Sequence, residues 1–350
     1  MLTALDDHDG AAVDWLFVYK LPDRRPRGGS SARGSLTTGF EYLYFDSNAS
    51  APLALSPHAL DDSSGALHRT LEQVFSVGED IPDGRGWVLY NDEIPGAASN
   101  NEDRGHAKGV IAFDLATDSA LWLLHSTPRW PLPRSAAFPH DERIYAQTYL
   151  CITLPDVATV QRISAQMRAQ QQPQVYGCHI PPGLARDTAL HALARGDLAA
   201  PLDAPSTVTF ESRGGHPFES IAKSRHWGKD FWIDLVGPAL ADDLGVETWR
   251  RGTVPDTEDR GGSDHVDDVL HVDLNPLGVD IGWAYTKDHA KWAVGEGSDW
   301  VCVADLNRQV SQQKRGGGSI CLSHRLLHDG LAKLVGQSSA PGSVSPPIGP

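Results

Sequence analysis

The sequence is poor in basic residues and has no long hydrophobic run. Its 30 Lys and Arg stand against 45 Asp and Glu, which gives a formal charge of −15 at pH 7. This balance argues against a protein that coats nucleic acid by bulk positive potential at neutral pH. No apolar run approaches the roughly 18 residues of a membrane span, so we expect no membrane partner.

Cysteine is also scarce. Four Cys are too few for a disulfide scaffold, and they lack the paired short spacings of a zinc ribbon. Cys302 and Cys321 lie in "WVCVAD" and "GSICLS", which predict two strands joined by a Gly-rich loop. A disulfide there would suit an exported protein, and two buried thiols are the alternative that the sequence leaves open.

The chain begins with acidic residues where a secretory signal would be basic and then apolar, so no signal peptide is predicted in it. The expected protein is therefore cytoplasmic or a mature form whose signal has been removed. Histidine, in contrast, is plentiful. Full protonation of the 15 His would offset the whole formal charge, so a polyanionic substrate would be repelled less in acid.

Periodicity and composition divide the chain into four parts. Residues 1–155 and 205–336 read as two halves rich in strands, 156–204 as a helical connection and 337–350 as a disordered low-complexity tail. The main strands are expected at 13–22, 40–47, 86–92, 109–114, 120–126, 145–154, 207–212, 246–251, 269–275, 289–294, 300–306 and 317–323. Helices are expected at 66–75, 157–170, 188–198 and 228–245.

The triplet His-Ala-Lys occurs twice. His106 and Lys108 lie in "GHAKGVIAFD", and His289 and Lys291 lie in "DHAKWAV". In each copy an apolar run, an acidic turn and a Trp-led strand follow. One such triplet carries little information, but two with matching flanks are typical of a duplicated unit. The sequence therefore predicts an α/β fold with two pseudo-symmetric halves that face one central active site.

Residues i and i+2 of a strand point to the same face, so each triplet is expected to present its His and Lys together. Two copies would place two imidazoles and two ammoniums around one point, an arrangement that suits phosphoryl transfer. One His attacks phosphorus and the other protonates the leaving oxygen, while the lysines neutralise the non-bridging oxygens. The resulting phosphohistidine is then hydrolysed, and neither a metal nor another cofactor is needed.

The strings "VDWLFVYKLP", "RGHAKGVIAFD", "WLLHSTP", "YAQTYLC", "VETW", "DHAKWAV" and "RGGGSIC" occur in an order and spacing that resemble the deoxyribonuclease II family, the acid endonucleases of the phospholipase D superfamily. The resemblance extends over about residues 13–335. It implies two phospholipase D-like halves, each a mixed β-sheet flanked by helices. It also implies metal-independent cleavage of double-stranded DNA at acid pH, leaving 3′-phosphate and 5′-hydroxyl ends.

The resemblance also assigns residues. His106 with Lys108 and His289 with Lys291 match the two catalytic pairs of the family, and we choose His289 as the nucleophile. Further positions are expected to bind the substrate or to support the site. They are His125 in "WLLHSTP", Asn307 and Asp305 in "ADLNR", Lys20 in "VYKLP" and Gln147 in "YAQT". A core histidine bonded to a neighbour is the alternative interpretation of His125.

The chain departs from the family at its cysteines. Ala4 stands where the family has an early Cys, so Cys151 is expected to be free or to pair with Cys178. A Cys pair that animal members carry toward the C-terminus is missing. These departures favour a bacterial homologue that is secreted or periplasmic, whereas a eukaryotic member would act in a lysosome-like acidic compartment. A homodimer could clamp a duplex.

Other interpretations compete with this one. The fold could serve a phospholipase D-type phosphodiesterase with another substrate, or a catalytically silent DNA-binding module. "RGGGS" (315–319) could form a phosphate nest or a tight turn. A basic loop carries Arg24, Arg25, Arg27 and Arg33. An acidic cluster, without the spacing of a known metal motif, comprises Asp264, His265, Asp267, Asp268, His271 and Asp273.

Overall fold

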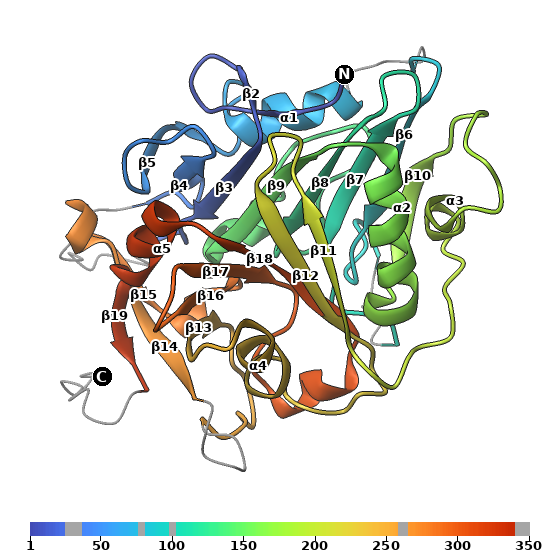
Figure 1. Cartoon of the computed structure of the whole chain (residues 1–350). Coiled ribbons are helices and arrows are strands. Elements are labelled where there is room, and N and C mark those ends of the chain that lie inside the picture. The colour runs from blue at the N-terminus through green and yellow to red at the C-terminus, as the bar shows by residue number, and fades with distance from the viewer. Residues whose placement is uncertain (25–36, 76–80, 98–102, 258–264, 340–350) are drawn as a thin grey trace.

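The computed structural model describes residues 1–24, 37–75, 81–97, 103–257 and 265–339 (Figure 1). This part of the chain is a mixed α/β protein in which strands predominate and two large sheets form the frame. The expected α/β class is confirmed. None of the helices among the described residues is long and apolar enough to cross a membrane.

The first sheet is built from the N-terminal part of the chain and one later strand. Its spatial order is β10 (Val175–His179), β6 (Arg85–Tyr90), β7 (Gly109–Asp114), β8 (Ser119–His125), β9 (Gln147–Leu154), β3 (Trp15–Lys20), β4 (Glu41–Asp46) and β5 (Ala54–Ala59). All its neighbouring strands are antiparallel. The short strands β1 (Ala4–Leu5) and β2 (Ala12–Val13) pair separately.

The second sheet is built from the C-terminal part. Its spatial order is β11 (Ser206–Glu211), β12 (Pro217–Lys223), β18 (Gly317–Ser323), β17 (Trp300–Ala304), β16 (Lys291–Gly295), β13 (Leu244–Thr248), β14 (Val266–Asp273) and β15 (Gly282–Ala284). Strand β19 (Val335–Ser338) also pairs with β14. The order β6-β7-β8-β9-β3 of the first sheet resembles the order β13-β16-β17-β18-β12 here, whereas the next strands differ, because β4 follows β3 along the chain and β11 precedes β12.

The helices are short. They are α1 (Ala66–Phe75), α2 (Val157–Gln166), α3 (Ala189–Ala194), α4 (Gly237–Leu240) and α5 (Arg325–Ala332). The π-helices are η2 (Met167–Gln171) and η3 (Trp232–Val236). The 3₁₀ turns are η1 (His140–Ile144), η4 (Asn275–Leu277), η5 (Tyr285–Lys287) and η6 (Val310–Lys314).

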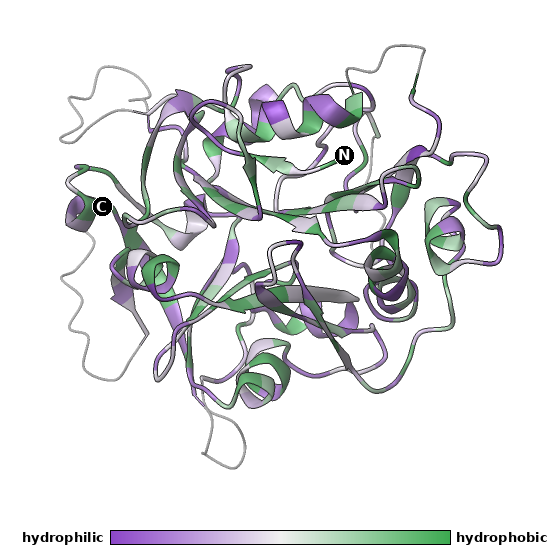
Figure 2. Ribbon diagram, turned by 45° about the horizontal axis from the view of Figure 1, so that its top comes forward, coloured by the Kyte–Doolittle hydropathy of each residue, from purple (hydrophilic) through white to green (hydrophobic). Residues whose placement is uncertain are grey.

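The two sheets lie face to face around a shared hydrophobic core, with α1 outside one and η3–α4 outside the other (Figure 2). Successive residues of a strand serve different layers: Ile111 and Phe113 of β7 enter the shared core, whereas Val110 and Ala112 pack in the outer core with α1. Burial on both faces explains why these strands are continuous apolar runs. The inner core is what joins the two sheets into one body.

Most expected elements are present, and the helix expected at 66–75 matches α1. The helix expected at 228–245 is wrong in extent, because helical structure runs only from Trp232 to Leu240 and Leu244 already begins β13. The 156–204 segment is not purely helical, since it also supplies β10. The expected tail loses Gln337 and Ser338 to β19, and residues 340–350 lie outside the described part.

Candidate functional site

The two His-x-Lys segments adjoin the starts of β7 and β16, one in each sheet. We expected each motif to lie on a strand, but His106 and Lys108 precede β7, and His289 precedes β16. Each His instead hydrogen-bonds to backbone from the other part of the chain. The His106 N–H donates to the Gly316 carbonyl at 2.8 Å, and the His289 N–H donates to the Ala146 carbonyl at 2.9 Å.

The four motif side chains form one electrostatic group. Burial lowers the pKa of His106 and of His289 well below the usual histidine value, and the charges of Lys108 and Lys291 lower both further. Burial, followed by the charge of Lys108, also lowers the pKa of Lys291 to about 7. The charges of Lys108 and Lys291 therefore act on both imidazoles, which links the two pairs electrostatically.

His106 is held by polar groups at both ring nitrogens. Its Nδ1 donates to the carbonyl oxygen of Asp305 at 2.6 Å, so Nε2 is the nitrogen that can gain or lose a proton. The Asp92 carboxylate lies 3.8 Å from Nε2. The same carboxylate accepts a hydrogen bond from Lys108 Nζ and one from Arg315 Nη2 at 3.1 Å. Burial opposes ionisation of Asp92, but these cations hold the pKa of Asp92 below its usual range.

His289 has aromatic neighbours instead. The Tyr145 ring stacks on the imidazole with a centroid distance of 3.8 Å and an interplanar angle of 10°, and Trp249 lies at 4.7 Å. Its Nε2 is buried and has no hydrogen-bond partner among the described residues. Lys291 Nζ donates to the carbonyl of His289 at 2.5 Å. The stacking therefore fixes the plane of the ring, and Nε2 is not bonded to another described group.

The other expected residues occupy different places around this group. Asp305 is buried, accepts from the Gly318 N–H at 3.1 Å, and has a pKa raised by burial to about 7. The backbone N–H of His125, at the end of β8, donates to the Lys108 carbonyl at 3.2 Å. Both ring nitrogens of His125 are buried without a hydrogen-bond partner in the described chain. Asn307 Oδ1 is likewise buried and unpartnered. Buried polar atoms without a hydrogen-bond partner are rare in folded proteins.

Lys20 and Gln147 lie behind the site. Lys20 is fully buried, and its Nζ donates to three backbone carbonyls, those of Leu21, Arg143 and Tyr145. It thus supports the segment whose Tyr145 ring stacks on His289. Gln147 is also fully buried and accepts from Ser126 Oγ at 2.5 Å. Gln147 Nε2 has no hydrogen-bond partner among the described residues, and contact of either side chain with a substrate stays a prediction.

The glycines of "RGGGS" form neither a nest nor a turn. Gly317 begins β18, and Gly316 lies where a Cβ atom would be 2.5 Å from the Gln171 carbonyl oxygen. Gly105, which precedes His106, is more restricted still, because its Cβ would lie 1.7 Å from the same oxygen. These two glycines permit the close backbone approach through which the His106 N–H reaches Gly316.

The acidic cluster is divided among other contacts. His265 pairs with Asp267 at 2.6 Å, and Asp268 binds Arg308 at 2.9 Å. Asp264 lies outside the described residues, as do Arg25, Arg27 and Arg33 of the basic loop. In the described part of the chain, no group of three or more His, Cys, Asp or Glu is placed to hold a metal ion.

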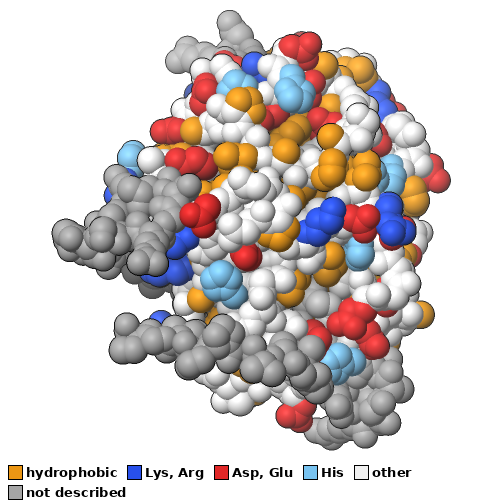
Figure 3. All heavy atoms as spheres, turned by 90° about the vertical axis from the view of Figure 1, so that its left-hand side faces the viewer, with side chains coloured by type: hydrophobic (Ala, Val, Ile, Leu, Met, Phe, Trp, Pro, Cys, Tyr) orange, Lys and Arg blue, Asp and Glu red, His pale blue; other side chains and the backbone are white. Residues whose placement is uncertain are grey.

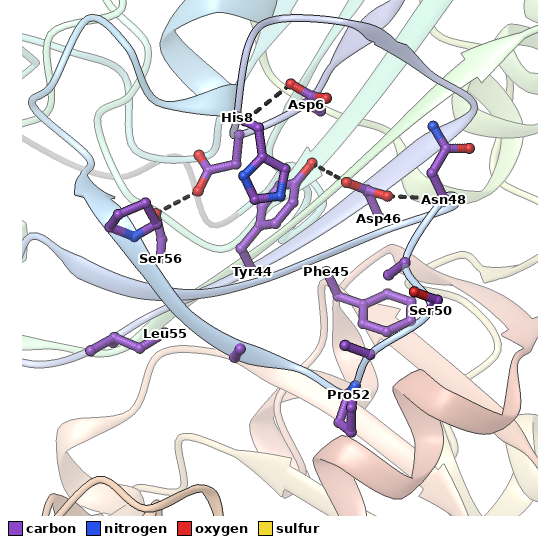
Figure 4. A pocket seen from close by; sticks show the side chains of 15 residues that line it. Asp6, His8, Tyr44, Phe45, Asp46, Asn48, Ser50, Pro52, Leu55 and Ser56 are labelled. Atoms are coloured by element: carbon purple, nitrogen blue, oxygen red, sulfur yellow. Dashed lines mark hydrogen bonds between the residues drawn. The ribbon is translucent and has the colours of Figure 1, made fainter.

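A surface hollow beside β4 and β5 is separate from the His and Lys pairs (Figure 4). Its carboxylates already have partners within the protein. Asp46 accepts from Tyr44 at 2.8 Å, and Asp7 accepts from Ser56 at 2.5 Å. Asp6, His8, Asn48 and Ser50 also line the hollow, together with aromatic and aliphatic side chains.

The cysteine expectations are resolved. Cys302 and Cys321 lie opposite each other on β17 and β18 and form a disulfide. Cys151 is buried and free, and Cys178 is exposed and free. Of the two outcomes expected for Cys151, the structure therefore shows the unpaired one.

Sequence reasoning missed Asp92, Tyr145 and Trp249. Asp92 stood unmarked at the end of the expected strand 86–92, and Tyr145 and Trp249 stood within strings read only as strands. The available signal was the position of two of them at strand ends. Asp92 lies two residues after β6, and Trp249 directly follows β13. These strands pair with β7 and β16, the strands that the His-x-Lys motifs adjoin. Contacts between distant segments cannot be read from such positions alone.

Paired imidazoles and ammoniums on one α/β scaffold define, as a class, a protein suited to phosphoryl chemistry. The family model of deoxyribonuclease II matches residues 6–340, and the chain belongs to this family. It is thus a nuclease, which is a hydrolase, and its family membership supports a deoxyribonuclease function.

Named relatives agree with this assignment. A Burkholderia thailandensis protein named "Putative deoxyribonuclease-2" is 45% identical over 332 residues, which cover 93% of this chain and 91% of the relative. Deoxyribonuclease-2 of Caenorhabditis elegans is 33% identical, with 95% and 92% covered. Deoxyribonuclease-2-alpha of Sus scrofa is 32% identical, with 95% and 89% covered. The Burkholderia relative fits the expected bacterial homologue.

Proposed function

We propose that the protein is a metal-independent acid endonuclease that cleaves double-stranded DNA to 3′-phosphate and 5′-hydroxyl ends through a phosphohistidine. The observation that carries the proposal is that the His106 N–H donates to the Gly316 carbonyl and the His289 N–H donates to the Ala146 carbonyl, so each motif contacts the other half of the chain. Two imidazoles can share attack and proton transfer, while two ammoniums can neutralise the phosphate.

The proposal includes two pseudo-symmetric phospholipase D-like halves, residues 1–155 and 205–336, joined by 156–204 around one central site. The similar strand order supports it. So do paired contacts: Lys20 Nζ binds the carbonyl of Tyr145, and Lys223 Nζ binds that of Arg315 at 2.6 Å. In both halves a buried lysine thus binds the backbone of the segment that hydrogen-bonds to the motif histidine of the other half.

The reaction would run in two steps. In the first, one imidazole nitrogen bonds to phosphorus, the P–O5′ bond breaks, and the second histidine gives its proton to the departing oxygen. In the second, that histidine takes a proton from water, the water oxygen bonds to phosphorus, and the P–N bond breaks. Lys108 and Lys291 stabilise charge on the non-bridging oxygens throughout. His125, Asn307 and Asp305 would contact the phosphate or fix the histidines.

Acid would favour this chemistry for two reasons. The pKa of Lys291 is lowered to about 7, so this lysine is fully charged only below neutral pH. Protonation of surface histidines also reduces the repulsion of DNA by a chain with formal charge −15. On the face shown in Figure 3, Lys and Arg side chains occur in small separate groups with Asp, Glu and His between them.

The proposed setting is secreted or periplasmic. A disulfide between Cys302 and Cys321 suits an oxidising compartment. Double-stranded DNA is the proposed partner, and a homodimer is the assembly that could enclose a duplex. A homodimer predicts that the mass in solution is twice that of the chain.

His289→Ala and His106→Ala test the function against its alternatives. Both variants should bind duplex DNA within about threefold of the wild type and cleave it at least 10³-fold more slowly, because chemistry and not binding needs the imidazoles. A silent DNA-binding module would show no cleavage even in the wild type. A phospholipase D-type enzyme with another substrate would hydrolyse phosphatidylcholine vesicles faster than plasmid DNA.

A further inference from the structure

Asp92 joins groups from both sheets at one carboxylate. It lies two residues after β6 and is 2% exposed. Oδ1 accepts from Lys108 Nζ, Oδ2 accepts from Arg315 Nη2 at 3.1 Å, and Oδ2 lies 3.8 Å from His106 Nε2. A buried carboxylate with two cationic partners has a fixed position, so its separation from the imidazole is also fixed.

The corresponding position beside the second histidine holds a different kind of side chain. Tyr90 on β6 and Glu247 on β13 each lie opposite the residue that follows the motif lysine of their own half. Two residues further along the chain come Asp92 and Trp249. The strand register therefore matches a carboxylate near His106 with an indole near His289, whose ring centroid is 4.7 Å from the imidazole.

This difference separates the two imidazoles chemically. Burial and nearby cations lower the pKa of both histidines, but the Asp92 carboxylate opposes this shift at His106, since an opposite charge favours the charged form. Among the described residues, no carboxylate lies within ion-pair distance of His289, which is stacked between Tyr145 and Trp249. Burial and then the charges of Lys291, Lys108 and Lys20 lower the pKa of His289, and a neutral imidazole has a nitrogen lone pair that can attack phosphorus.

We propose that Asp92 is a positioning residue that keeps His106 as the proton carrier, so that His289 is the histidine that attacks phosphorus. This division of roles rests on the proposed nuclease function. The other charged groups that act on His106 are Lys108, Arg315 and Lys291, all of which oppose its protonation. Asp92 is the carboxylate that acts against them, and the anionic phosphate of DNA would add to its effect when bound.

The division fixes where each proton goes. His289 bonds to phosphorus as the P–O5′ bond breaks, and the Nε2 proton of His106 moves to the 5′ oxygen. His106 then takes a proton from the attacking water as the P–N bond breaks and the 3′-phosphate leaves. While the product phosphate is bound, His106 carries the proton at Nε2 beside Asp92, and His289 is neutral.

Asp92→Asn in the full chain tests the proposal with two substrates in excess chelator. Cleavage of a short DNA duplex should fall by about 100-fold, because its alkoxide leaving group needs a proton. The first turnover of bis(4-nitrophenyl) phosphate should fall by less than about fivefold, because 4-nitrophenolate leaves without one. A merely structural role would lower both rates alike, and this result would overturn the proposal. Asp92→Glu should recover part of the DNA cleavage, and Asp187→Asn, at an exposed loop residue, serves as the matched control.

The site of covalent attachment decides the question without any variant. Wild-type protein is mixed with the duplex at acid pH and quenched in alkali, and the modified peptide is identified by mass spectrometry. The expected adduct is on His289, and an adduct on His106 would overturn the proposal even if Asp92→Asn failed to fold. Failure of the proposed function looks different, because the wild type would then not cleave the duplex in chelator at all.

Discussion

The ring of Tyr145 lies parallel to the imidazole of His289 at a centroid distance of 3.8 Å, although the two residues belong to segments that lead into different sheets. The contact is reinforced at the backbone, where the His289 N–H donates to the carbonyl of Ala146. Lys20 in turn binds the Tyr145 carbonyl. One segment therefore fixes both the position and the plane of an imidazole from the other half.

Removing the Tyr145 ring should loosen His289. An aromatic pair contributes about 0.5–1.5 kcal/mol beyond its buried area, which corresponds to roughly a 2- to 10-fold change. We expect Tyr145→Ala to lower kcat for duplex cleavage by about 10-fold and Tyr145→Phe to stay within about twofold of wild type. Steady-state kinetics on an end-labelled duplex measure both. Equal losses in the two variants would assign the effect to the hydroxyl and contradict the stacking role.

The pH dependence should report Lys291. Burial and the charge of Lys108 lower the pKa of Lys291 to about 7, so the ammonium is present below pH 7 and is lost as the pH rises through that value. We expect kcat/KM for DNA to fall across this range in the wild type. In Lys291→Arg the charge persists to high pH. The alkaline limb should therefore move upward by at least about one pH unit, whatever the absolute activity. An unmoved limb would show that another group controls it.

Gly105 should not tolerate a side chain. A Cβ there would lie 1.7 Å from the Gln171 carbonyl oxygen and 3.0 Å from that of Gly316, both of which are backbone atoms. Gly105→Ala should displace His106, lower cleavage by at least about 10-fold and reduce the melting temperature. The control is Gly183→Ala, whose Cβ would meet only the Leu115 side chain at 3.3 Å. Normal activity in Gly105→Ala would mean that this backbone approach does not position the histidine.

The disulfide should contribute stability without serving the chemistry. Cys302 and Cys321 are 19 residues apart, and closing a loop of this size stabilises a fold by about 3 kcal/mol in the chain-entropy treatment. The double substitution Cys302→Ala and Cys321→Ala should lower the unfolding free energy by roughly this amount in urea. The control double substitution at the free thiols is Cys151→Ala and Cys178→Ala. If the control loses as much stability, packing of the thiols rather than the bond is responsible.

The sequence was sufficient to predict the two repeated His-x-Lys segments and the strands that follow them. The two His-x-Lys segments could be matched because each precedes an apolar strand, and burial on both strand faces preserves that pattern. β10 (Val175–His179) was missed because its half-buried, glycine-containing run lacks both alternation and length. The helix expected at 228–245 was overextended because its apolar spacing continues into β13, where pairing with β16 determines the structure.

The site was only partly predictable for a related reason. His106, Lys108, His289 and Lys291 carry a motif, whereas Asp92, Tyr145 and Trp249 act through contacts between segments distant in the chain. No local pattern encodes such contacts. Lys20 and Gln147 belong to recognisable strings, but their full burial depends on tertiary packing that those strings do not encode.

The most direct test of the central claim is cleavage of supercoiled plasmid near pH 5 in excess chelator, followed by end-group analysis of the fragments. The account predicts nicks and breaks that carry 3′-phosphate and 5′-hydroxyl ends at an undiminished rate, because the two imidazoles and two ammoniums supply the nucleophile, the proton and the positive charge. Plasmid that stays intact in chelator and is cut again when a divalent ion is added would contradict it.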